Sequence, residues 1–200
     1  MLDGLEGVVA AETVLSDVDG EAGVLIVRGR SLDELAGRVA FEDMVGLLFE
    51  GFYPDLPAGI PAALGQARVD VFAEVAALDT GLLDRTPIEA VRALTARLAD
   101  GDDAQVAFRL LAAPAVFTAA VVRARAGEAP DPTLGHAADV LRMLRGQPAT
   151  KAEADALDTY LVTVADHGLN ASTFAARVVA STRAGLGSGD DARTTLSDAQ

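Results

Sequence analysis

The stretch SLDELAGRVAFEDMVGLLFE, Ser31 to Glu50, marks the point at which the sequence changes from strand-like to helical. It opens with a capping box, in which the Ser31 hydroxyl accepts from a free backbone N–H and the Glu34 carboxylate accepts from the N–H of Ser31. Thr86 and Thr150 open the same pattern, each with a glutamate three residues later. The pattern predicts three helix starts, and we expect the chain after residue 31 to be mainly helical.

The spacing of apolar residues predicts where these helices run, and glycines just beyond amphipathic segments predict where three of them stop, at Gly101, Gly127 and Gly146. The predicted helices span 31–39, 41–50, 60–79, 87–99, 103–126, 132–145, 151–165 and 171–184. Pro114 should kink the fifth of them. We expect at least four-fifths of residues 31–184 to be helical.

Two segments rich in valine, isoleucine and leucine, 7–15 and 24–28, precede the helical region. They flank the turn-like sequence Asp17 to Gly20, so we predict a β-hairpin as the only sheet. The acidic residues of this turn lack the further ligands of a calcium loop. The predicted fold is therefore mainly α, with a hairpin segment at 1–30, a helical large-domain portion at 31–184 and a flexible tail at 185–200, whose polar composition buries little.

Composition excludes several classes of function. The chain has 200 residues, and its 16 basic and 30 acidic side chains give a net charge of −14, which argues against nucleic acid or an anionic membrane as the main partner. There is no cysteine, and two histidines are a weak set of metal ligands, so we predict no metal site. The longest apolar run, 110–122, is too short to cross a bilayer, and no export signal opens the chain. We predict a cytoplasmic protein.

The stretch ADHGLNASTFAARVVAST, 165–182, contains the first candidate for chemistry, His167. Asn170, Ser172 and Thr173 follow it and can cap the next helix, whose amino end favours an anion. A neutral imidazole N–H and a positive helix end together suit a carboxylate ligand. The alternative is that His167 only caps the carboxyl end of the preceding helix.

Other polar residues carry weaker signals. His136 lies near a predicted helix start without a cluster around it, which favours a structural histidine, partly exposed or hydrogen-bonded. Several arginines could clamp a carboxylate or phosphate, although ion pairs on helix surfaces are the simpler interpretation. These are Arg123, Arg125, Arg142, Arg145, Arg177 and Arg183.

Longer stretches together resemble the citrate synthase family. GLEGVVAAETVLSDVDGEAGVLIVRG, residues 4–29, followed by LDELA and FEDMVGLLFEGFYP, is similar to its N-terminal block. GHAADVLRMLRGQP, 135–148, and ALDTYLVTVADHGLNASTFAARVVAST, 156–182, resemble the stretch that leads into the first active-site histidine of that family. The blocks occur in family order and span residues 4 to about 184.

The resemblance implies a nearly all-helical homodimer with a large and a small domain. Such enzymes condense oxaloacetate with acetyl-coenzyme A, or with propionyl-coenzyme A to make 2-methylcitrate. The resemblance gives His167 the role of hydrogen-bonding oxaloacetate, with Asn170 and Ser172 in supporting roles. It implies no cofactor, since acyl-coenzyme A is a co-substrate.

The chain also departs from that family. A GPxHGG segment, a GxGHR segment, the later catalytic aspartate and the C-terminal arginines have no counterpart in this sequence. We therefore expect an N-terminal portion of the large domain that holds no certain catalytic residue and is inactive alone. The alternative is a non-catalytic module for helical dimerisation or dicarboxylate binding. A purely helical interaction domain is a third possibility, which the context of His167 disfavours.

Overall fold

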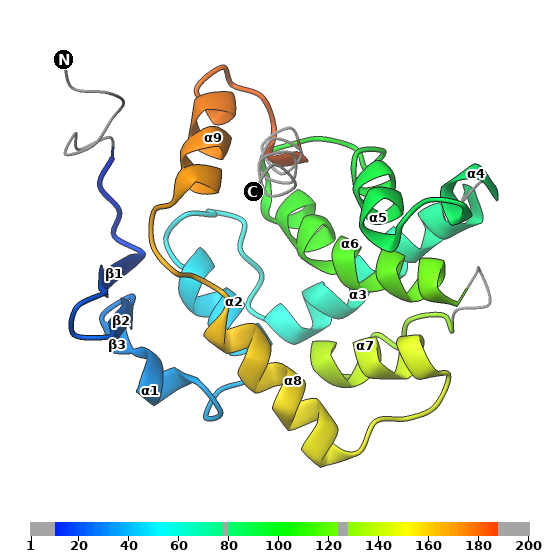
Figure 1. Cartoon of the computed structure of the whole chain (residues 1–200), viewed down its shortest axis with the longest axis horizontal. Coiled ribbons are helices and arrows are strands. Elements are labelled where there is room, and N and C mark those ends of the chain that lie inside the picture. Colours follow the sequence, from blue (N-terminus) through cyan, green and yellow to red (C-terminus); the bar gives the residue numbers. More distant parts are fainter. Residues whose placement is uncertain (1–10, 78–79, 124–127, 188–200) are drawn as a thin grey trace.

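A small β-sheet lies at one edge of a helical body (Figure 1). The computed structural model describes residues 11–77, 80–123 and 128–187. Strands β1 (Ser16–Asp19), β2 (Val24–Val27) and β3 (Arg30–Ser31) pair antiparallel in that order, with Ser16 opposite Val27 and Val18 opposite Leu25.

The remaining elements are helices, which confirms the mainly α prediction. In chain order they are α1 (Leu32–Leu35), α2 (Phe41–Phe49), α3 (Ile60–Ala73), the 3-10 turn η1 (Glu74–Ala77), α4 (Thr80–Leu83), α5 (Pro87–Thr95), α6 (Ala104–Val122), α7 (His136–Arg145), α8 (Lys151–Thr163) and α9 (Ala171–Ala180).

The three predicted capping boxes are present. The backbone N–H groups of Ser31, Thr86 and Thr150 donate to the carboxylates three residues later, at 2.8, 3.0 and 2.8 Å. The Ser31 hydroxyl also donates to the Glu34 carboxylate, at 3.0 Å, which adds a third contact to the capping box. At Glu153 these bonds and the Arg145 guanidinium lower the carboxyl pKa to about 2.

Of the three glycines predicted to end helices, one does so, one does not and one lies outside the described residues. Gly146 has φ +73 and ends α7 in the left-handed conformation, as expected. Gly101 is not a cap, because α5 ends earlier, at Thr95, and the chain closes with tight turns at 96–98. Gly127 lies outside the described residues.

Other boundaries also differ from prediction. Within the described residues the first strand is Ser16–Asp19, later than the predicted 7–15, of which 7–10 lie outside the described residues. The Asp19 side chain accepts from the N–H groups of Glu21 and Ala22 and so places the turn later. A third strand, β3, extends the hairpin. Less than four-fifths of the described residues in 31–184 are helical, since loops occupy stretches such as 50–59 and 128–135.

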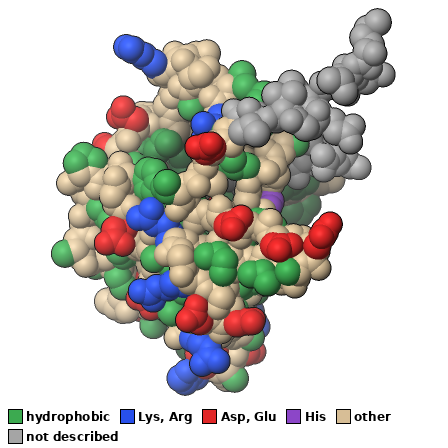
Figure 2. Space-filling model, turned by 90° about the vertical axis from the view of Figure 1, so that its left-hand side faces the viewer, with side chains coloured by type: hydrophobic (Ala, Val, Ile, Leu, Met, Phe, Trp, Pro, Cys, Tyr) green, Lys and Arg blue, Asp and Glu red, His purple; other side chains and the backbone are tan. Residues whose placement is uncertain are grey.

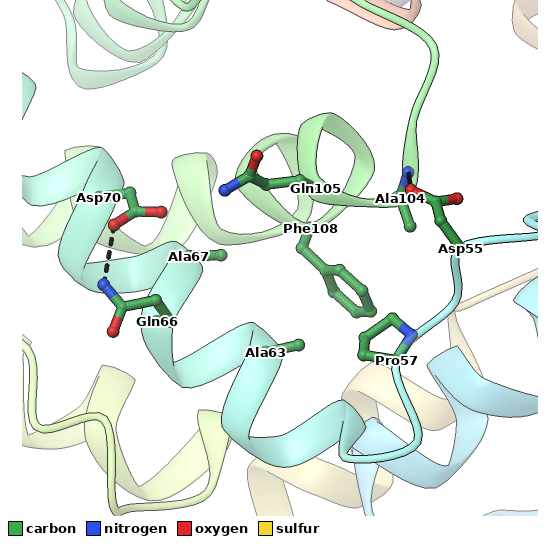
Figure 3. A pocket seen from close by; sticks show the side chains of 9 residues that line it. All are labelled: Asp55, Pro57, Ala63, Gln66, Ala67, Asp70, Ala104, Gln105 and Phe108. Carbon is green, nitrogen blue, oxygen red and sulfur yellow. Dashed lines mark hydrogen bonds between the residues drawn. The ribbon is translucent and has the colours of Figure 1, made fainter.

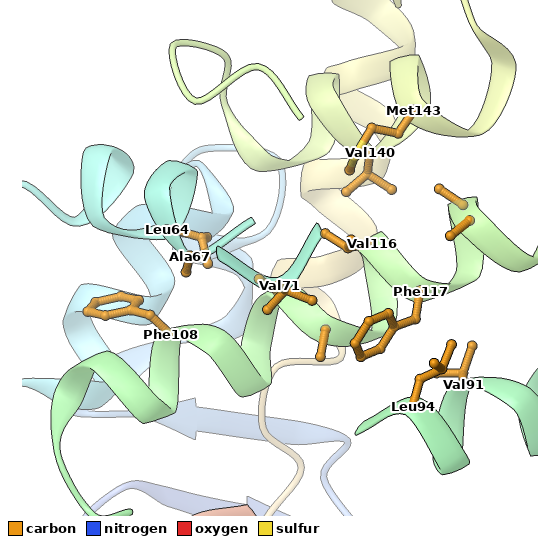
Figure 4. Packing of buried hydrophobic residues seen from close by; sticks show 14 of the residues in the cluster. Leu64, Ala67, Val71, Val91, Leu94, Phe108, Val116, Phe117, Val140 and Met143 are labelled. Atoms are coloured by element: carbon orange, nitrogen blue, oxygen red, sulfur yellow. The ribbon is translucent and has the colours of Figure 1, made fainter. Parts of the chain in front are cut away.

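The main core surrounds α6, which packs against α3, α5 and α7 (Figure 4). Val116 and Phe117 of α6 are buried, and Figure 4 shows Phe117 beside Val91 and Leu94 of α5. By length and composition alone α6 could cross a membrane, but its burial among other helices is typical of a core helix. The helix continues through Pro114 without a break.

A second, smaller core joins the sheet to the helices. It consists of Val27 from β2, Leu35 from α1, Met44 from α2 and Val162 from α8, all with at most 1% of their surface exposed. We refer to these four residues as the sheet cluster. The sheet cluster is important because it holds the end of α8, where Val162 lies five residues before His167.

Candidate functional site

The turn between α8 and α9 carries His167. After α8 ends at Thr163, the Asp166 carboxylate accepts the N–H of Gly168 at 2.8 Å. Gly168 has φ +83, a conformation that a residue with a side chain rarely adopts. This tight turn leaves His167 exposed at its tip.

Asn170 connects this turn to α9. Its side-chain oxygen accepts from the Thr173 N–H at 2.8 Å and from the Thr173 hydroxyl at 3.0 Å, which caps the helix. Its amide nitrogen lies 3.3 Å from each ring nitrogen of His167. The structure thus brings together two of the residues that the sequence singled out.

Ser172, the third predicted site residue, lies in the first turn of α9 and is half-buried. Within the described residues, its hydroxyl and the backbone N–H groups of Ala171 and Ser172 have no hydrogen-bond partner. The amino end of α9 therefore presents free donors beside an exposed imidazole. Such an arrangement can hydrogen-bond a carboxylate, and the partial positive charge of the helix end favours it.

Several cavities open in the described part of the molecule, and three of them are relevant here. A mostly apolar one of about 880 Å³ opens between α2, α6, α7 and α8 and borders Ala165, two residues before His167. A second, of about 420 Å³, lies between α9 and α6 and includes Arg177. In the third, of about 250 Å³, Figure 3 shows the Phe108 ring between α3 and α6. There Asp55 accepts from Ala104 and Asp70 from Gln66, so these carboxylates are already engaged.

Sequence reasoning missed a buried polar network between α3 and α7. The fully buried Arg68 donates to the Asp139 carboxylate at 2.7 Å and to the carbonyl of Leu134 at 2.7 Å. Asp139, also fully buried, accepts in addition from Arg142 and from the N–H of Asp131. The network therefore fixes the loop in front of α7.

Gly65 lets this loop approach α3. A Cβ atom at this position would collide with the carbonyl oxygen of Pro132, so only glycine fits one turn before Arg68. An isolated arginine in the pattern LGQARVDVF gives little sign of this role. Its only signal is that it occupies a position otherwise expected to be apolar.

His136 belongs to this network, in agreement with the prediction of a structural histidine. It is 4% exposed, its Nδ1 lies 3.4 Å from an Arg68 nitrogen, and its backbone N–H donates to the buried Glu42 at 2.6 Å. Burial and the positive charge of Arg68 lower its pKa to about 3. The imidazole is therefore neutral near pH 7, with Nδ1 accepting from Arg68.

Two of the six predicted arginine clamps form ion pairs within the protein. Arg142 pairs with Asp139 inside the network, and Arg145 pairs with Glu153 at 2.5 Å. Arg125 lies outside the described residues. Figure 2 shows cationic and acidic side chains interspersed on the face that it presents, without a continuous basic patch. In the ranges that the structure describes, no group of three His, Cys, Asp or Glu could hold a metal ion.

Comparisons with known proteins agree on one family. The family model described as citrate synthase, C-terminal domain, matches residues 4–189. Citrate synthase from Haloferax volcanii is 36% identical, over 92% of this chain and 53% of the relative. A 2-methylcitrate synthase from Mycobacterium tuberculosis is 34% identical, over 92% of this chain and 50% of the relative.

A solved structure gives the same result. Citrate synthase from Thermoplasma acidophilum, solved with carboxymethyl coenzyme A and oxaloacetate, superposes with a TM-score of 0.74 at 25% identity, covering 94% of this chain and 54% of that one. The chain spans about half the length of the relatives that it matches. A family match over nearly the whole chain, together with the shared fold, shows that this chain belongs to the citrate synthase family.

Proposed function

We propose that this chain supplies part of the oxaloacetate site of a citrate or 2-methylcitrate synthase. The reaction would condense an acyl-coenzyme A, acetyl or propionyl, with oxaloacetate. His167 would donate a hydrogen bond to the dicarboxylate, and Asn170 would orient the imidazole. Ser172 and the free N–H groups of α9 would add donors on the same side. The cytoplasmic location stays a prediction.

One observation carries this proposal: the exposed imidazole of His167 and the open amino end of α9 lie side by side on one short turn. The α-keto dicarboxylate offers several acceptor oxygens to such donors. The hydrogen bond from an imidazole to a carboxylate contributes about 1.5–3 kcal/mol when one partner is charged. Binding at this turn requires no rearrangement of the buried network around His136.

The chemistry of condensation needs more than this turn. A weak carbon acid such as a thioester methyl requires a base at the α-proton and a donor at the developing enolate oxygen, in the same site. The chain has two histidines, and the ring nitrogen Nδ1 of the buried His136 is engaged by Arg68. We therefore propose that these 200 residues alone bind the dicarboxylate without forming citrate.

The test is to titrate the purified chain with oxaloacetate and to monitor the ring signals of the two histidines by NMR. We expect oxaloacetate to shift the His167 signals and leave those of His136 unchanged. His167→Ala should weaken binding by about thirtyfold, because about 2 kcal/mol is lost. Equal affinity of His167→Ala and the unsubstituted chain would refute the assignment, and release of coenzyme A that depends on oxaloacetate would refute the predicted inactivity.

A dimerisation role is the second candidate, and exposed apolar side chains favour it. Along α8, α9 and the turn between them, Tyr160, Val164, Leu169, Phe174 and Val178 are each at least 44% exposed. Such a row of apolar groups favours association. We propose that the protein forms a homodimer. Sedimentation that finds only monomer at high concentration would contradict this proposal.

A further inference from the structure

The position of His167 depends on the end of α8, and the β-sheet holds that end. Val162, on the last turn of α8, is fully buried in the sheet cluster, which also contains Val27 of β2. Ala165, two residues before His167, packs against the same cluster. The backbone that leads into the turn is therefore fixed by contacts with the sheet.

The sheet also touches the far side of His167. Val18 of β1 lies against Gly168, so close that a Cβ atom built on Gly168 would fall 2.7 Å from Val18 Cγ2. Apart from the two chain neighbours of Gly168, no other residue in the described ranges comes within 4 Å of that position. Val18 is thus the neighbour that limits how the left-handed residue after His167 can move.

Strand pairing explains why one face of the sheet makes both contacts. Val18 is directly opposite Leu25, and side chains of opposite residues project to the same face. Val27, two residues on, also projects to that face. Val27 is a member of the sheet cluster, and Leu25 packs against it. The adjacent Val24 projects to the other face, and the two valines, Val18 and Val24, are similarly exposed, at 50% and 42%.

We propose that the N-terminal sheet is a positioning element of the dicarboxylate site and that Val18 is its positioning residue. This rests on the proposed function of His167. Val18 does not touch the ligand. It closes the space beside Gly168, so that the turn, and with it the imidazole, keeps one orientation relative to the amino end of α9. A site held in place by such a contact loses affinity when the contact is trimmed.

The experiment compares Val18→Ala with Val24→Ala in the full chain. Val24→Ala removes the same two methyl groups from the same sheet but on the opposite face. Two quantities are measured: the NMR signals of the His167 ring and the Gly168 amide in the free protein, and the affinity for oxaloacetate. Val18→Ile, which keeps a branched side chain at the contact, tests rescue.

We expect Val18→Ala to shift the His167 and Gly168 signals and to lower oxaloacetate affinity roughly fivefold. Val24→Ala and Val18→Ile should leave both unchanged. Intact His136 signals show that a variant is folded. The proposal is overturned if the folded Val18→Ala variant has the same His167 and Gly168 signals as Val24→Ala. If the unsubstituted chain does not bind oxaloacetate, the proposed function fails, while the signals of the free protein still decide whether Val18 positions the turn.

Discussion

The two histidines of this chain lie in opposite environments. His136 is buried at the start of α7, next to the charged pair of Arg68 and Asp139, and its main-chain N–H reaches Glu42. His167 is exposed on a turn whose next helix, α9, buries none of its residues. The polar groups of the first region fix the fold, whereas the second region leaves its imidazole exposed. Substitutions should therefore affect stability in the first region and binding in the second.

The largest effect is expected at Arg68. Replacing it with methionine, Arg68→Met, keeps much of the volume but leaves the buried Asp139 carboxylate without its main partner. Breaking a buried ion pair by removing one member costs about 3–5 kcal/mol of unfolding free energy. Urea denaturation measures this cost. Arg145→Met is the control, since its pair with Glu153 is exposed to solvent and should contribute far less to stability. Equal losses in the two variants would contradict the role of the network.

This network also shows where sequence-based prediction stops. The helix starts at Ser31, Thr86 and Thr150 were predictable because a capping box is complete within four residues. The pair of Arg68 and Asp139 joins residues 71 positions apart, and nothing in either local sequence specifies the partner. An arginine on a helix is ordinarily interpreted as a surface cation.

The candidate site was predictable to a similar extent. Asn170 as cap of α9 and its closeness to His167 follow from local sequence, because three residues separate them. The contact of Val18 with Gly168 depends on how the sheet docks on α8, and the prediction placed the first strand several residues too early. The contact between Val18 and Gly168 therefore depends on long-range packing, which the local sequence does not specify.

Acidification tests the buried histidine. The folded pKa of His136, about 3, lies below the ordinary value of 6.5, so between these values the unfolded chain binds a proton that the folded chain does not. This contribution to stability is complete above pH 6.5 and falls as the pH drops toward 3, by about 1.4 kcal/mol per pH unit. In His136→Gln this part of the pH dependence should disappear. Parallel stability curves for the two proteins between pH 6.5 and 4 would show that His136 does not titrate as described.

A smaller and more local effect is expected at Asn170. Asn170→Ala removes the cap of α9 and should destabilise that helix by about 1 kcal/mol. Because α9 buries none of its residues, the helix can fray without unfolding the core. Amide hydrogen exchange at Thr173 and Phe174 should therefore accelerate, while the urea midpoint hardly moves. Asn170→Ser, which can still cap, is the control, and a large shift of the urea midpoint in Asn170→Ala would mean that α9 is part of the core.

The smallest effect on stability is expected at His167, where the expected loss of binding is large. The ring is exposed and its only hydrogen-bond partner within the described residues is the Asn170 amide, so His167→Ala should change the unfolding free energy by less than about 0.5 kcal/mol. The same substitution removes the donor proposed for oxaloacetate. If His167 binds the ligand, its loss should lower the oxaloacetate affinity and leave the unfolding free energy almost unchanged. If His167 merely caps α8, its loss should lower the unfolding free energy instead. Urea denaturation of His167→Ala alongside its oxaloacetate titration makes the distinction: a loss of stability near 1 kcal/mol with unchanged affinity would identify His167 as a cap, and unchanged stability with lost affinity would identify it as a ligand-binding residue.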